Sequence, residues 1–181
     1  STQTHSYGEL YNEINLKTGG IAPAVNTYTD ADDLSRYTAT FDMKAKVLYE
    51  NLEDAFALVS EILTKSCYTD SKRIFELIAE ARSEKQAHMM SAGHTLAAGV
   101  ALSYLSKPAM VMEQINGMPF YRMLEDLEEH FEERFPELSA NLARLVECLF
   151  CAENLMVDYT STEDGLCGVE ELVEKFKKTL Y

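Results

Sequence analysis

The chain has 181 residues, of which 46% are hydrophobic, and a formal net charge of −14 at pH 7. The apolar content is sufficient for a folded core, which excludes a disordered chain. Nucleic acid is excluded as a partner because phosphate binding needs clusters of Lys and Arg, and the Lys and Arg of this chain are not clustered. No apolar run reaches the roughly 18–20 residues that span a bilayer, so no membrane partner is expected either.

The first predicted element is a short capped helix. Ser6 is a suitable N-cap, and Glu9, three residues later, completes a capping box in which each side chain bonds the other residue's backbone N–H. Gly19 and Gly20 end the helix, since glycine tolerates the left-handed conformation that follows many helices. The chain should therefore change direction at the two glycines.

Two strands joined by an acidic turn are predicted next. Residues 21–29 are expected to be extended, and Pro23, which lacks a backbone N–H, limits them to an edge or bulged strand. Residues 37–44 alternate apolar and polar side chains, which is the period of a half-buried strand. The aspartates within residues 30–33 favour a turn between the two strands.

Helical periodicity dominates the middle of the chain. An amphipathic helix is predicted from about residue 46 to 65, and a long helix from about residue 72 to 105. Gly93 and Gly99 weaken the long helix and predict a kink or break. Because residues 89–102 are rich in Ala, Gly and Met, we expect another element to approach closely and bury this half.

The last third of the chain alternates helices and breaks. Helices are predicted over residues 109–116, from Phe120 to Phe131, from Leu138 to Leu149 and from Val169 to Leu180, with Pro136 separating the second from the third. Alternating side chains predict one more strand over residues 154–160. The result is an α+β chain, expected to form a single domain over residues 1–181 with a helical insertion at 106–135.

The cysteines are expected to be structural. Cys148 and Cys151 form a C-x-x-C, but a zinc ribbon needs a second pair at matching spacing, which is missing. Together with Cys67 and Cys167 they are predicted to be buried free thiols, which suits a reducing compartment.

Two clusters of polar residues are candidates for chemistry. Glu80, Glu84 and His88 lie at i, i+4 and i+8 on one predicted helical face and could ligate a metal, although one helix rarely supplies all three zinc ligands and a solvated helix face is the simpler explanation. The acidic run over residues 125–133 could bind a basic peptide or form the wet side of an amphipathic helix.

A family resemblance connects these segments. The chain resembles the third, non-catalytic domain of the presequence-protease-like branch of the pitrilysin/insulinase zinc metallopeptidases. The residues that carry the resemblance are Tyr7-Gly8-Glu9-Leu10, Glu13-Ile14, Thr18-Gly19-Gly20-Ile21, Glu80-Ala81-Arg82-Ser83-Glu84, Ser91-Ala92-Gly93-His94 and the predicted strand at 154–160. The zinc motif of those enzymes, H-x-x-E-H, occurs nowhere in the chain.

The resemblance implies a fold and a role. The fold would be a metallopeptidase-like α/β roll without its first strands, with an antiparallel sheet packed against long helices and a helical excursion near 106–150. The chain would form part of the wall of a closed chamber in which a zinc-dependent peptidase degrades peptides. Glu128 and Glu132 are the candidates to face the substrate.

The implied chemistry lies outside these residues. No catalytic residue, metal ligand or cofactor is assigned to this segment, and zinc would belong to the parent enzyme, a hydrolase. The implied partners are other domains of the same parent chain and the peptide substrate, with a homodimer of the excised piece as a further expectation. The implied location is the bacterial cytoplasm or the mitochondrial matrix.

Two alternative functions stay open. The chain could be a free-standing acidic protein-interaction module with no link to proteolysis, docking through its acidic helix. It could also be an independent metalloenzyme that uses Glu80, Glu84 and His88.

Overall fold

The computed structural model describes residues 1–33 and 35–181. Its contacts form two compact units. The first contains Ser1–Pro23, Met43–Thr69 and Ser139–Tyr181, and the second contains Ala24–Asp42 and Asp70–Leu138. The single domain over residues 1–181 and the helical insertion at 106–135 stay predictions.

The first unit begins with the predicted capped helix. Helix α1 covers Tyr7–Lys17, the N–H of Glu9 donates to the Ser6 hydroxyl, and the N–H of Ser6 donates to the Glu9 carboxylate at 2.9 Å. The capping box is therefore confirmed. Gly20 has a φ of 109°, a value that L side chains rarely adopt, so glycine is required where the chain turns into the first strand.

Helix α2 (Leu52–Lys65) is the centre of the first unit. It follows a 3-10 turn and packs against α1 and against α8 (Val169–Lys177), where the rings of Phe56 and Phe176 meet edge to face at 5.5 Å. The predicted start at about residue 46 was too early. The carbonyl of Lys46 accepts from the N–H of Gly19 at 2.7 Å, and this contact keeps the preceding segment extended.

The N-terminal residues are tied to α2 by a partly buried carboxylate. The side chain of Glu61 is 13% exposed, accepts from the Thr2 hydroxyl, and lies 2.7 Å from Nδ1 of His5. Burial by itself would raise the pKa of Glu61, but hydrogen bonds from Thr2, Thr4 and His5 outweigh it and lower the pKa to about 2. The hydrogen bond between His5 and Glu61 also raises the pKa of His5 above 6.5.

The strand predicted at 154–160 does not form. After a 3-10 turn at Ala152–Asn154 the chain is extended but joins no sheet. A strand needs a neighbour for its backbone ladder, and the described residues supply none for this segment. The side chain of Tyr49 fixes the chain directly after this segment. Its hydroxyl accepts from Ser161 Oγ at 2.8 Å and from the N–H of Thr162 at 3.3 Å.

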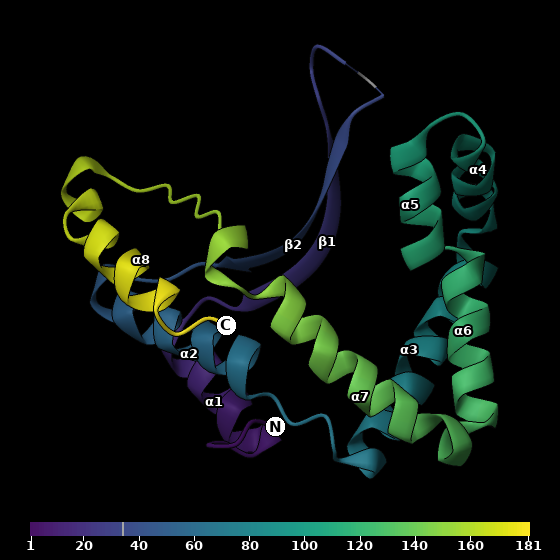
Figure 1. The fold of residues 1–181 in the computed structure, drawn as a ribbon, viewed down its shortest axis with the longest axis horizontal. Helices are drawn as coiled ribbons and strands as arrows, with labels where there is room; N and C mark the ends of the chain where they lie inside the picture. Colours follow the sequence, from purple (N-terminus) through teal and green to yellow (C-terminus); the bar gives the residue numbers. More distant parts are fainter. Residues whose placement is uncertain (34) are drawn as a thin grey trace. The chain divides into compact units, whose positions relative to one another are not determined.

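The predicted hairpin is confirmed. Strands β1 (Ile21–Thr29) and β2 (Tyr37–Ala45) form a two-stranded antiparallel ribbon (Figure 1). Asp30 and Asp33 each accept from a backbone N–H two residues later, at 2.9 Å, which is the local bonding that aspartate brings to a turn. A sheet and many helices together confirm the predicted α+β class.

Five helices follow in the order α3, α4, α5, α6 and α7. They cover Ser71–Ser91, Gly93–Ser103, Lys107–Asn116, Met118–Glu129 and Phe131–Leu149. Helix α3 packs against α6, and α5 packs against both α4 and α6 (Figure 1). Of the described helices, none has the length and apolar composition needed to cross a membrane. The long helix predicted over 72–105 breaks at Ala92, next to the expected Gly93.

The core of the second unit lies between α3 and α6 and continues onto α7. Its buried members are Ile78, Leu124, Leu127 and Phe131, which are 5 to 8% exposed. Phe131 also meets the ring of Phe75 edge to face, with the ring centroids 5.1 Å apart. This apolar seam fixes α3 beside α6.

The predicted break at Pro136 is wrong. Helix α7 runs through Pro136, and the chain breaks at His130, whose φ of −116° and ψ of 31° are not helical. Pro136 removes one backbone hydrogen bond close to the start of α7. The side chains of Phe135 and Leu138 pack against the core on either side of it and hold the helix together.

Two predictions of burial are also wrong. No residue of α4 is buried, although the Ala-, Gly- and Met-rich half of the long helix was expected to be covered. All four cysteines are free as expected, but Cys67, Cys148 and Cys167 are exposed and Cys151 is only partly covered. Both errors have the same cause. Apolar composition favours burial of a segment, but it does not show whether another element packs against that segment.

Leu124 tests the α3–α6 core. Leu124→Ala leaves a cavity at a position that is 5% exposed, so it should lower the free energy of unfolding by about 2 to 5 kcal/mol. Urea denaturation followed by circular dichroism measures the change. Met123→Ala on the same helix is the control, because Met123 is 47% exposed and should change stability by less than about 0.5 kcal/mol. Equal losses would show that the seam is not the core.

Glu61 tests the N-terminal attachment through pH. Its pKa of about 2 lies below the ordinary 4.5, so its stabilising contribution is present above pH 4.5 and is lost as the pH falls towards 2. The contribution of His5 is complete below pH 6.5 and is lost as the pH rises through its raised pKa.

Glu61→Gln should therefore flatten both limbs of the stability profile. Urea denaturation between pH 2 and pH 9 measures the profile, and Glu170→Gln, at an exposed position of α8, is the control. A Glu61→Gln profile parallel to that of the unchanged chain would contradict this account of the Glu61 carboxylate.

Candidate functional site

A shallow hollow lies on the α3–α6 face of the second unit. Ala81, Glu84, Lys85 and His88 of α3 and Phe120 of α6 line a space of about 380 Å³. Three polar groups of different charge and an aromatic ring therefore meet at one place, directly outside the apolar seam.

Lys85 is the best-held polar group of this hollow. Its ammonium donates to the backbone carbonyl of Asn116 at 2.9 Å and lies 5.7 Å from the centroid of the Phe120 ring. Asn116 is the last residue of α5, so a cation meets the negative end of that helix. The arrangement joins α3, α5 and α6 at one edge of the hollow.

The structure brings together two of the three predicted metal candidates. Glu84 and His88 both line the hollow, whereas Glu80 does not, and all three side chains are exposed. Over residues 1–33 and 35–181, no three His, Cys, Asp or Glu side chains are grouped closely enough to hold an ion. The Lys85 ammonium in the same hollow would also repel a cation.

The predicted acidic run is divided between two helices. The break at His130 leaves Glu128 on α6 and places Glu132 on the first turn of α7. Glu128 accepts from Arg82 of α3 at 3.0 Å and its side chain is 25% exposed, whereas Glu132 is exposed. The two candidate substrate-facing residues therefore differ, since one is paired with a cation.

Arg82 is one of two residues whose contacts sequence reasoning missed. Its guanidinium lies 3.0 Å from Glu128 and 3.7 Å from Glu125, and the hydrogen bond to Glu128 raises the pKa of Arg82. These partners are 43 and 46 positions away in the chain, and no local spacing could predict the contact.

A second missed residue, Glu113, lies at the turn between α5 and α6. The Glu113 carboxylate accepts from the N–H of Met118 at 3.1 Å and so caps the start of α6. A Cβ at the buried Gly117 would lie 2.1 to 2.2 Å from this carboxylate, so a larger residue there would have to displace it. The turn between the two helices positions Asn116 for its contact with Lys85.

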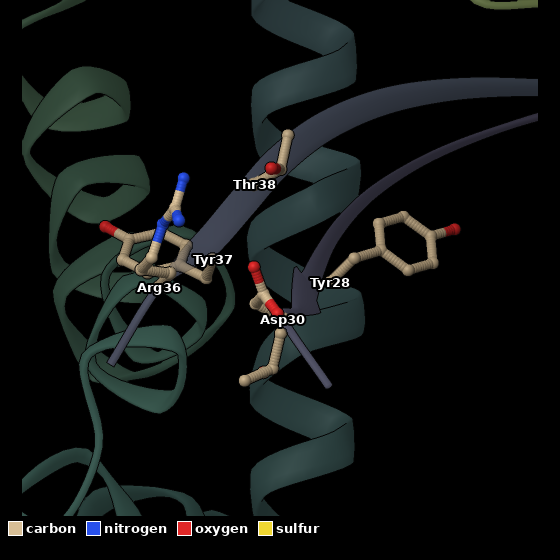
Figure 2. A pocket seen from close by; sticks show the side chains of 6 residues that line it. Tyr28, Asp30, Arg36, Tyr37 and Thr38 are labelled. Carbon is tan, nitrogen blue, oxygen red and sulfur yellow. The ribbon is translucent and has the colours of Figure 1, made fainter. Parts of the chain in front are cut away.

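A second hollow, of about 280 Å³, lies at the end of the hairpin. Tyr28, Thr29 and Asp30 of one side and Arg36, Tyr37 and Thr38 of the other line it. Figure 2 shows Arg36 and Tyr37 close together at the start of β2, with the ring of Tyr28 pointing away from them. Farther along the ribbon, Asp42 accepts from Asn26 at 2.6 Å and from the Tyr28 hydroxyl at 2.9 Å, a bond that raises the pKa of Tyr28.

Comparison with protein families gives one match that covers most of the chain. Residues 1–127 match the family model described as Peptidase M-16-C associated. The matched part contains α1, the hairpin, α2 to α5 and most of α6.

Curated relatives match over nearly the whole chain. Protein HypA of Clostridium perfringens is 27% identical over 98% of this chain and 17% of its own length. Presequence protease 1, chloroplastic/mitochondrial, of Arabidopsis thaliana is 24% identical over 97% of this chain and 16% of its own length. The mitochondrial presequence protease of Saccharomyces cerevisiae is 25% identical over 99% of this chain and 18% of its own length. The chain thus spans about a sixth of the length of these relatives.

Metal analysis tests the two ligands in the α3–α6 hollow. Because Glu84 and His88 provide two ligands and a stable zinc site usually has three or four, the purified chain should carry far less than one zinc per molecule. Mass spectrometry of the metal content measures this, and His88→Ala should leave the content unchanged. A content of one zinc per chain that His88→Ala removes would instead support the independent metalloenzyme.

Proposed function

Because this chain belongs to the Peptidase M-16-C associated family, we propose that it is a non-catalytic domain of a zinc-dependent metalloendopeptidase that degrades peptides inside a closed chamber. The family match over residues 1–127 carries the proposal. It is supported by relatives named presequence proteases, of which this chain spans about a sixth. The other domains of such a peptidase would be its partners.

The cutting chemistry is assigned to another part of the parent chain. Peptide hydrolysis of this type needs a zinc ion that activates water and a glutamate that acts as the general base. The histidines of H-x-x-E-H bind the zinc, and its glutamate is the base. The sequence contains no such motif. In the proposal the present residues therefore enclose and orient peptide, and the zinc is bound elsewhere.

The charge of the chain suggests which peptides it would favour. A net charge of −14 produces a negative field that attracts basic chains before contact. Within the acidic run, Glu128 is already paired with Arg82, so the exposed Glu132 is the stronger candidate to face a basic peptide. The proposed role is an acidic section of the chamber wall.

The free-standing interaction module is the rival proposal, and the acidic helices α6 and α7 would be its docking face. The reading frame separates the two. A frame that also encodes H-x-x-E-H supports the peptidase domain, and a frame that encodes only these residues supports the module. The location in the bacterial cytoplasm or mitochondrial matrix is part of the first proposal, and relatives named as mitochondrial or chloroplastic proteases support an organelle.

Charge reversal of Glu132 in the full-length peptidase tests the wall. Glu132→Lys should lower kcat/KM for basic peptides by about two- to fivefold at low salt, because one exposed charge acts at a few ångströms through water, and should not lower it for acidic peptides. Glu128→Lys should show the same selectivity and also a lower melting temperature, since it separates Glu128 from Arg82.

The matched control is Glu170→Lys, which makes the same charge change at an exposed position of α8. It should leave the preference for basic peptides intact. Equal losses for basic and acidic peptides in Glu132→Lys, or the same selective loss in the control, would contradict a role for this part of the surface.

A further inference from the structure

Helix α4 lies in an uncharged stretch of a strongly charged chain. Asp, Glu, Lys and Arg make up 25% of the residues, yet none of them occurs from Gln86 to Ser106. Helix α4 covers Gly93–Ser103 within this stretch, and none of its residues is buried. An uncharged helix without a buried residue is unusual, because a helix that is apolar on all sides is normally covered on all sides.

One face of α4 is covered by α5. Leu96, Gly99 and Val100 are partly buried, at the spacing of one helical face, and α4 packs against α5. A Cβ at Gly99 would lie 3.4 Å from the carboxylate of Glu113 on α5. This face is therefore already used within the second unit.

The other face of α4 is apolar and exposed. Ala98, Ala101 and Leu102 lie at i, i+3 and i+4 of α4, and Leu105 follows in the turn after the helix. All four are exposed, with Leu102 at 53% and Leu105 at 80%. Ala98 and Ala101 are small enough for another backbone to approach closely. We call these four residues the outer α4 face. Apolar side chains that gather on one exposed surface are typical of places where a partner docks.

The chemistry of the outer α4 face selects among its occupants. A basic peptide would be attracted to the acidic side chains of α6 and α7 and would find no counter-charge among these four residues. Interfaces that are permanent are more apolar than transient ones, which fits a partner that is always present. The relatives place a segment like this one within a chain about six times longer, so most of such a polypeptide is tethered nearby at high effective concentration.

We infer that the outer α4 face docks on an apolar surface of another domain of the same peptidase chain. This inference rests on the proposed function, because it needs the rest of a peptidase as the occupant. It goes further by naming the surface of this domain that contacts the remainder of the enzyme. Ala98 and Ala101 would form the floor of the contact, with Leu102 and Leu105 inserted into the partner domain.

Hydrogen exchange in the 181-residue chain and in the full-length peptidase tests the docking. The amides of residues 93–103 should exchange at least about tenfold more slowly in the peptidase, because docking suppresses local opening of α4. Leu102→Lys in the peptidase should remove this difference. Met123→Lys, at an exposed apolar position of α6, should preserve it. If Leu102→Lys prevents folding, as judged by circular dichroism, Ala98→Glu makes the same test with a smaller side chain.

Two results would overturn the docking. The first is equal exchange of residues 93–103 in the isolated chain and in a peptidase that cleaves peptides, which leaves the proposed function standing. The second is a dimer of the isolated chain in sedimentation that Leu102→Lys dissociates, which would assign the face to a second copy. A parent protein without H-x-x-E-H that cleaves no peptide would overturn the proposed function itself.

Discussion

The apolar seam between α3 and α6 is the contact on which the second unit depends. Ile78 on one helix and Leu124 and Leu127 on the other fix the two helices side by side, and the polar contacts of Arg82 and Lys85 lie directly outside them. The seam is thin, since none of the described side chains is less than 2% exposed. A small domain that buries little surface is marginally stable, which agrees with the proposed role as one part of a larger polypeptide.

Charged and apolar surfaces lie in different segments of this chain. The proposed chamber wall uses the charged surface, and the proposed docking uses the apolar one. The acidic side chains of α6 and α7 are solvated or paired, as Glu128 is with Arg82, and provide a long-range field. The outer α4 face carries no charge and provides a contact surface. A chamber wall needs both properties, because it must attract peptides on one side and stay attached to its enzyme on the other.

Features set by neighbouring residues were predicted well from the sequence. The capping box of Ser6 and Glu9, the hairpin and the break next to Gly93 depend on contacts within a few positions, and the structure confirms them. The family resemblance drawn from such segments is confirmed by the family match.

Features set by distant contacts were not predictable. The segment at 154–160 has strand periodicity without a partner strand, α7 continues through Pro136 because core contacts flank it, and Arg82 binds residues more than 40 positions away. Composition predicted that α4 would be buried, and none of its residues is.

The central claim is that this polypeptide supports proteolysis without performing it. The most direct measurement is hydrolysis of a set of unfolded peptides by the purified 181-residue chain, with added zinc and with a chelator. The account predicts no cleavage above the background rate in either condition, because the sequence lacks the H-x-x-E-H motif that binds zinc and activates water. Cleavage that zinc restores and the chelator abolishes would contradict it.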